Sequence, residues 1–94
     1  MQILTTPLYE KQLKGLLTLL HKQNIQETKK FKMYLDTVIV NMQTKEKKYK
    51  KSIYFNDEDI KDIEFHGCRI VFLVDKSNSS YILLGITQKS ELYT

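Results

Sequence analysis

The sequence predicts a small α+β domain in which a helical hairpin precedes an antiparallel sheet. Two observations carry this prediction. Apolar side chains recur at helical spacing in the first half of the chain, whereas the second half has the short alternating or continuous apolar runs of strands. The 94 residues can build one hydrophobic core, so residues 1–94 are expected to form a single domain.

The first helix is expected to begin at Pro7. A short apolar segment, Gln2 to Leu4, precedes it, and Thr6 is a suitable N-cap for a proline at the first helical position. Apolar residues that share one helical face then follow: Tyr9, Leu13, Leu16, Leu17 and Leu20. This face is expected to lie on the core.

The second helix is expected to begin after Asn24, which has capping-box spacing to Glu27. Its apolar stripe consists of Phe31, Leu35, Val38 and Met42. Because only the short connection from His21 to Gln23 separates the two helices, they are expected to be antiparallel neighbours.

A basic segment follows, residues 44–51 (TKEKKYKK), with five lysines and one glutamate. It has two interpretations. Cations suit the C-terminus of a helix, and they also suit a strip that contacts phosphates, with Tyr49 stacking on a base. The residues that the second interpretation assigns to RNA binding are Lys47, Lys48, Tyr49, Lys50, Lys51 and, further along the chain, Lys61.

Strands make up the second half. Four strand segments are predicted between loops rich in turn-forming residues: Ser52–Phe55, Ile60–Phe65, Cys68–Asp75 and Ser80–Ile86. His66 and Gly67 are expected to form a tight turn. The run CRIVFLVD is apolar at nearly every position, as expected of a central strand that is covered on both sides.

Composition limits the possible chemistry. Cys68 is the only cysteine, so neither an internal disulfide nor a zinc site is expected, and a reducing cytoplasm is the natural location. The sequence shows no signal peptide and no run near the ~20 apolar residues of a membrane span. It also lacks a glycine-rich phosphate loop and metal-ligand spacing, so no metal or other cofactor is expected. The net charge of +4 favours an anionic partner such as nucleic acid.

Arg69 is the only arginine among fifteen cationic residues. Its guanidinium can bind phosphate or carboxylate with two hydrogen bonds, which lysine cannot do. One interpretation is that Arg69 pairs with an acid along its strand. The other is that the C-terminal residues fold across the same sheet face and bring Lys89 and Tyr93 to one phosphate, unless Tyr93 belongs to a frayed terminus. Such a set would suit metal-free attack by a ribose 2′-hydroxyl.

Residues 60–94 resemble the C-terminal half of the RelE/ParE superfamily, the toxins of type II toxin–antitoxin pairs. The matching parts are Gly67-Cys68-Arg69 before an apolar strand, the hairpin, a strand that carries Gly85, and the tail Ser90-Glu91-Leu92-Tyr93. The preceding elements match in order and length. The resemblance implies a β-α-α-β-β-β fold, with the helical hairpin on one face of a twisted antiparallel sheet.

The resemblance also implies an activity. RelE-like toxins cut mRNA on the ribosome, and ParE-like toxins inhibit DNA gyrase without nuclease residues. Arg69 matches the RelE-type strand arginine, and Tyr93 matches the tail tyrosine proposed for proton transfer. This match favours a metal-independent mRNA endoribonuclease in which Lys89 helps to hold the phosphate.

Departures from the RelE pattern keep two other functions open. Thr87 stands where many members have a second arginine, and Ile60 and Asp62 stand where strand lysines are expected, with Lys61 and Lys89 nearby. The alternatives are a ParE-like gyrase inhibitor and a catalytically degenerate domain that binds the antitoxin. The expected partner is an antitoxin whose disordered tail folds over the toxin. Operator DNA would be contacted only through that antitoxin, and no membrane is involved.

Overall fold

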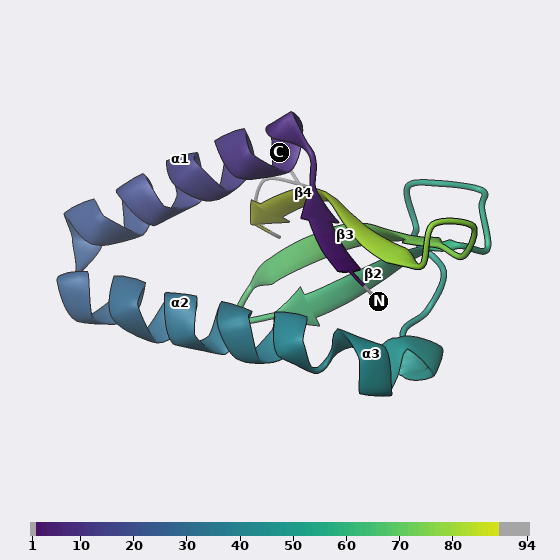
Figure 1. Cartoon of the computed structure of the whole chain (residues 1–94). Coiled ribbons are helices and arrows are strands. Elements are labelled where there is room, and N and C mark those ends of the chain that lie inside the picture. The colour runs from purple at the N-terminus through teal and green to yellow at the C-terminus, as the bar shows by residue number, and fades with distance from the viewer. Residues whose placement is uncertain (1, 89–94) are drawn as a thin grey trace.

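The structure, a computed structural model, describes residues 2–88 apart from the side chain of Phe65. Its elements follow one another along the chain as β1 (Gln2–Thr5), α1 (Pro7–Gln23), α2 (Ile25–Val40), α3 (Met42–Lys45), a 3₁₀ turn (Glu46–Lys48), β2 (Ile60–Phe65), β3 (Cys68–Asp75) and β4 (Ser80–Gln88). The predicted α+β class and β-α-α-β-β-β order are confirmed. Figure 1 shows α1 and α2 diverging from their tight connection, with the sheet between their open ends.

The helix ends follow the predicted capping. The Thr6 hydroxyl accepts a hydrogen bond from the Tyr9 N–H at 3.1 Å and lies 3.0 Å from the Leu84 carbonyl oxygen, so it both caps α1 and ties it to β4. Asn24 caps α2 by accepting from the Gln26 N–H at 2.8 Å. The connection is shorter than predicted, because α1 continues through Gln23 and leaves Asn24 as the only residue between the helices.

The sheet has the order β1-β4-β3-β2. β2 with β3 and β3 with β4 are antiparallel, as predicted, but β1 runs parallel to β4, with Gln2 opposite Ser80. The sheet is therefore mixed. The chain passes through α1, α2, α3, β2 and β3 between β1 and β4, and parallel strands require a long connection of this kind.

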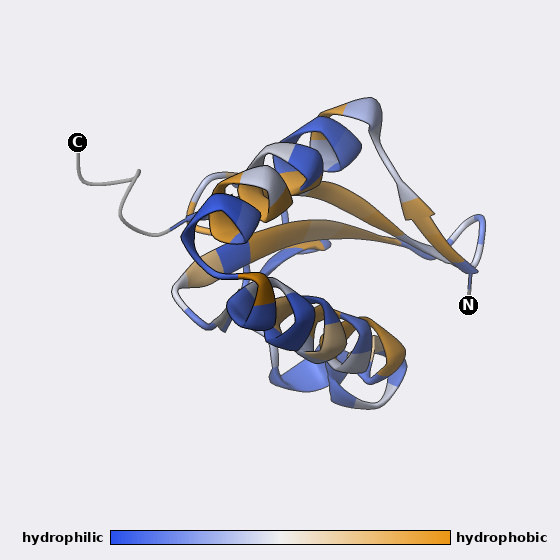
Figure 2. Ribbon diagram, turned by 90° about the vertical axis from the view of Figure 1, so that its left-hand side faces the viewer, coloured by the Kyte–Doolittle hydropathy of each residue, from blue (hydrophilic) through white to orange (hydrophobic). Residues whose placement is uncertain are grey.

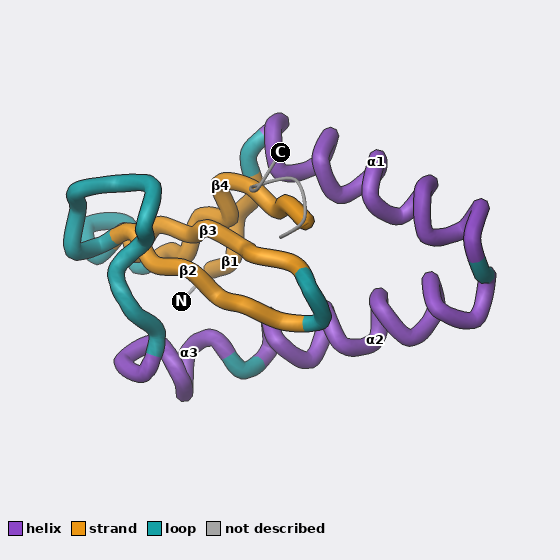
Figure 3. The backbone as a smooth tube through the Cα atoms, turned by 180° about the vertical axis from the view of Figure 1, so that it is seen from behind, coloured by secondary structure: helices purple, strands orange, loops and turns teal. Residues whose placement is uncertain are grey.

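The segment Ser52–Phe55 is not the strand that the sequence predicts. Pairing is limited to a single bridge between Lys51 and Lys61 and the hydrogen bond from the Ser52 N–H to the Ile60 carbonyl oxygen at 2.7 Å. The Tyr54 N–H then donates to the Ser52 hydroxyl at 3.1 Å, which turns the chain away from β2. Figure 3 shows this connection from α3 to β2 as a broad loop beside the sheet.

The core lies between the helices and one face of the sheet. Alternate residues of β3 point into it, namely Cys68, Ile70, Phe72 and Val74. Figure 2 shows apolar strands facing the inner sides of both helices. The intervening residues of β3, beginning with Arg69, therefore lie on the opposite face, which we call the outer face. Among the described residues, no helix is long and apolar enough to span a membrane.

Candidate functional site

The outer face carries a charged cluster of Arg69, Asp62 and Glu64. His66 and Gly67 form the turn between β2 and β3 with φ values of 46° and 76°, the left-handed pair of a two-residue hairpin. This turn places Glu64 directly opposite Arg69 in the register. Asp62 is two residues from Glu64, so it projects from the same face.

Arg69 makes two ion pairs in this cluster. Its Nη1 lies 2.8 Å from Asp62 Oδ2, and its Nη2 donates to Glu64 Oε1. The Asp62 side chain is only 6% exposed, whereas that of Glu64 is 47% exposed. Burial alone would lower the pKa of Arg69, but the hydrogen bond to Asp62 and the charges of Glu64 and Asp62 outweigh it and raise that pKa. Arg69 therefore stays cationic, and with both carboxylates ionised the cluster carries a net charge of −1.

The loop before β2 closes over one side of this cluster. The Ile53 N–H donates to Asp62 Oδ2 at 3.1 Å, and the Tyr54 ring centre lies 5.9 Å from Arg69 Cζ, within cation–π range. Within residues 2–88, two buried polar atoms of the cluster have no hydrogen-bond partner, Arg69 Nε and Asp62 Oδ1. The site thus has one hydrogen-bond donor and one acceptor that no described residue satisfies.

This arrangement combines a guanidinium with an accessible carboxylate. A guanidinium can stabilise a phosphate that gains negative charge, and a carboxylate can accept a proton from a hydroxyl group. In the structure Glu64 occupies Arg69 Nη2, so a phosphate must displace Glu64 before it can bind there. No group of three or more metal-ligating side chains that could hold a metal ion occurs within residues 2–88.

The predicted RNA-binding residues do not share one environment. Lys47, Lys48, Lys50 and Lys51 are exposed. Tyr49 is not presented to solvent as a stacking ring, because it packs edge-on against Phe72 with centroids 5.9 Å apart, and burial raises its pKa.

Lys61 lies on the core side of β2 rather than on the outer face. It is opposite Phe72 in the register, and its Nζ donates to the Glu46 carbonyl oxygen at 3.0 Å. The alternation of β2 that brings Asp62 to Arg69 turns Lys61 away from it. Lys89 and Tyr93, the other two predicted catalytic residues, lie outside the described residues.

Sequence reasoning missed Asp62, Glu64 and Tyr54 as members of this site. The alternation of β2 and the two-residue turn contain enough information to pair Glu64 with Arg69, because counting outwards from His66-Gly67 places them opposite each other. Tyr54 has no such signal, since a loop of irregular backbone brings it there.

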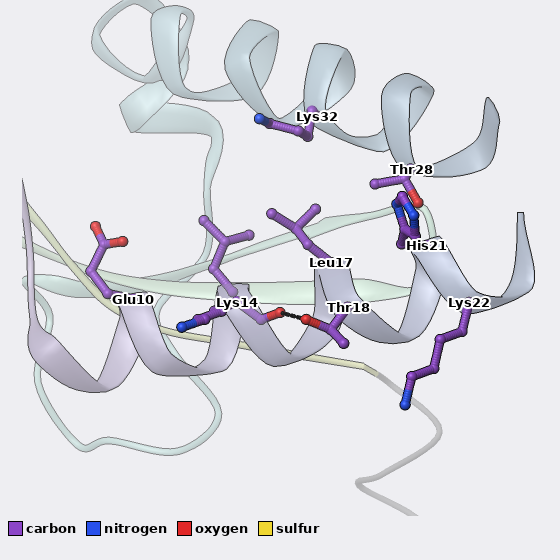
Figure 4. Close-up of a pocket in the computed structure, with 9 residues that line it drawn as sticks. Glu10, Lys14, Leu17, Thr18, His21, Lys22, Thr28 and Lys32 are labelled. Atoms are coloured by element: carbon purple, nitrogen blue, oxygen red, sulfur yellow. Dashed lines mark hydrogen bonds between the residues drawn. The ribbon is translucent and has the colours of Figure 1, made fainter. Parts of the chain in front are cut away.

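A separate groove lies between α1 and α2 and has a volume of about 590 Å³. Leu13 and Leu17 line it, and Figure 4 shows Leu17 pointing from α1 toward α2. Its charged lining residues are mainly basic: Lys14, Lys22 and Lys32, with Glu10 as the acid. The groove combines apolar walls with cationic edges.

Comparisons with known proteins inform the fold. No family model matches the chain, and no curated protein matches it. Among solved structures, the chain is similar to the solution structure of the conserved hypothetical protein HP0892 from Helicobacter pylori, with 20% identity and a TM-score of 0.62. The match covers 98% of each chain. At this identity the likeness establishes a shared fold over nearly the whole length.

Proposed function

We propose that this protein is the toxin of a type II toxin–antitoxin pair, related to the RelE/ParE superfamily and acting in the cytoplasm. The β-α-α-β-β-β order supports this proposal together with the superfamily-like motif around Arg69 and the Ser-Glu-Leu-Tyr tail. The chain also shares its fold with the Helicobacter pylori protein over nearly its whole length.

We further propose that the toxin is a metal-independent endoribonuclease that cleaves mRNA on the ribosome. The observation that carries this proposal is the pairing of Arg69 with the half-exposed Glu64 on the outer face. Of the two carboxylates, Glu64 is the one that can leave the guanidinium, since Asp62 is buried and held by both Arg69 and the Ile53 N–H.

In the proposed reaction, Glu64 accepts the proton of a ribose 2′-hydroxyl while Arg69 binds the adjacent phosphate. The 2′-oxygen attacks phosphorus, the bond from phosphorus to the 5′-oxygen breaks, and a 2′,3′-cyclic phosphate forms. Tyr93 donates a proton to the leaving 5′-oxygen, and Lys89 helps to hold the phosphate. One proton is accepted by Glu64 and one is donated by Tyr93, so the reaction needs no metal ion.

A second candidate is a ParE-like inhibitor that binds DNA gyrase and cuts no RNA. It is favoured by the same ion pairs, because two carboxylates neutralise Arg69 and give the site a net negative charge that repels phosphate. Under this alternative the cluster only stabilises the sheet. A degenerate domain that binds its antitoxin without toxicity would have the same structure.

Controlled induction of the wild-type chain and Glu64→Gln separates these functions. Glu64→Gln keeps a hydrogen-bond acceptor for Arg69 but removes the base, so the nuclease proposal expects loss of mRNA cleavage and of growth arrest. Glu58→Gln, an exposed acid in the loop before β2, is the control and should behave as wild type.

Each alternative has its own signature in this experiment. Intact mRNA with inhibited supercoiling in both the wild type and Glu64→Gln would establish the gyrase inhibitor instead. Normal growth on full induction of the wild type would indicate the degenerate domain.

For the antitoxin, we propose that an acidic amphipathic segment binds the groove between α1 and α2. Apolar side chains of such a segment would contact Leu13 and Leu17, and its carboxylates would face Lys14 and Lys32. Lys14→Glu with Lys32→Glu should weaken co-purification with the product of the adjacent gene, whereas Lys47→Glu with Lys48→Glu should not. Equal retention by both double variants would place the antitoxin elsewhere.

A further inference from the structure

The loop before β2 exposes three consecutive large apolar side chains. Ile53, Tyr54 and Phe55 are 70%, 43% and 46% exposed. The loop is nevertheless held in place, because Ser52 is buried, the Tyr54 N–H bonds to the Ser52 hydroxyl, and Lys51 Nζ donates to Asn56 Oδ1 at 2.7 Å. Exposed rings on a fixed loop are typical of a binding surface.

The position of Tyr54 connects this surface to the charged cluster. Its ring centre lies 5.9 Å from the Arg69 guanidinium carbon, and the Ile53 N–H bonds to Asp62. A group bound against the solvent-exposed part of the Tyr54 ring would therefore lie beside the groups that we assign to phosphate binding and proton transfer.

The charges around the loop favour a nucleic acid over an apolar protein segment. Only Ser52 separates Lys50 and Lys51 from the three apolar residues, and Lys47 and Lys48 lie in the 3₁₀ turn just before them. Aromatic rings combined with lysines bind single strands by stacking on bases and attracting phosphates. The acids at the far end of the loop are partly balanced, since Asp59 pairs with Lys76 at 3.8 Å.

We propose that Tyr54 and Phe55 form a stacking platform for an unpaired base of single-stranded RNA, next to the phosphate bound at Arg69. The proposal rests on the proposed nuclease function and names the contact that positions its substrate. It also reassigns the stacking role from Tyr49, whose ring packs against Phe72.

The test is the affinity for a fluorescein-labelled single-stranded RNA of eight nucleotides with 2′-O-methyl groups, which cannot be cleaved. Tyr54→Leu and Phe55→Leu should each weaken binding by about 5- to 150-fold, the range expected for loss of one stacked base. Tyr54→Phe keeps the ring and should bind as wild type. Ile53→Ala is the matched control, since it removes the most exposed apolar side chain of the same loop but no ring.

The outcomes separate failure of the platform from failure of the proposed function. If the wild type binds the RNA and both leucine variants bind equally well, the platform is wrong and RNA recognition stands. If Ile53→Ala weakens binding as much as Tyr54→Leu, the loop makes a general apolar contact and stacking is overturned. If the wild type does not bind the RNA at all, the platform is overturned, whereas the nuclease proposal is decided separately by mRNA cleavage in induced cells.

Discussion

At the scale of single residues, the burial of Arg69 determines how substitutions in the charged cluster affect stability. Asp62 and Glu64 bind two of its nitrogens, and within residues 2–88 the buried carboxylate of Asp62 forms an ion pair with Arg69 alone. A buried ion pair contributes little relative to apolar side chains, but loss of one partner leaves an uncompensated charge. Replacing one member of the Asp62–Arg69 pair should therefore lower the free energy of unfolding much more than replacing both.

Asp62→Ala should lower the free energy of unfolding by about 3 kcal/mol, the lower end of the range for a broken buried pair, because Glu64 remains to compensate Arg69. Urea denaturation measures this change. The double variant Asp62→Leu with Arg69→Leu should recover most of the loss. A double variant as unstable as the single one would show that the pair stabilises the sheet by more than mutual neutralisation.

Tyr9 should make stability depend on alkaline pH. It is only 2% exposed, its hydroxyl has no hydrogen-bond partner within residues 2–88, and burial with the nearby charges of Glu10 and Asp36 raises its pKa to about 12. The un-ionised ring is thus favoured in the folded state. Its contribution is complete below pH 10 and is lost as the pH rises through 12, a change on the order of 2–3 kcal/mol.

Thermal denaturation between pH 8 and pH 12 tests this dependence on Tyr9. Tyr9→Phe should be at least as stable as wild type at pH 8, since it removes an unsatisfied hydroxyl. Its stability should then fall less than that of wild type as the pH increases. Parallel curves for the two proteins would contradict the assignment.

At the scale of elements, sequence signals were reliable where one local interaction determines the structure. Thr6-Pro7 and Asn24 mark the helix starts correctly, and His66-Gly67 forms the predicted turn. The same reasoning failed at Ser52–Phe55, whose β-branched and aromatic residues favour a strand. There the Ser52 hydroxyl competes for the Tyr54 N–H and ends the pairing, and composition does not reveal that competition.

Alanine substitution at two glycines, one in a turn and one in a helix, should change stability in opposite directions. Gly67 has φ of 76°, so Gly67→Ala should destabilise the protein by about 1–2 kcal/mol, although space for the methyl group is open. Gly15 lies in α1 with nothing within 4 Å of an added Cβ, so Gly15→Ala should stabilise it by about 1 kcal/mol. Urea midpoints of the two variants provide the measurement, and a stabilising Gly67→Ala would contradict the turn geometry.

At the scale of the whole molecule, the sheet joins the two ends of the described chain. β1 pairs with β4, and Thr6 adds a hydroxyl contact to the same strand. The sequence predicted the order of elements but not this parallel pairing, because β1 is four residues long and its partner lies far along the chain. Within the charged cluster, Glu64 could be placed opposite Arg69 by counting outward from the turn, whereas Tyr54 could not be predicted because an irregular loop positions it.

Removal of residues 1–5 should expose the backbone of β4 as a new sheet edge. We expect a lower urea midpoint and concentration-dependent self-association, since unpaired strand edges recruit other chains. Light scattering and size-exclusion chromatography detect this association. Leu4→Lys is the control, because Leu4 is 44% exposed and the substitution keeps the backbone pairing. A monomeric truncated protein of unchanged stability would contradict the structural role of β1.

The pairing of β1 with β4 also affects when the protein can finish folding during its synthesis. Gln2 must wait for Ser80, 78 residues later, and ribosomes add about 5–20 residues per second. A nascent chain therefore spends about 4–16 s with β1 unpaired. The complete four-stranded sheet can therefore form only after both ends of the described chain have been synthesised.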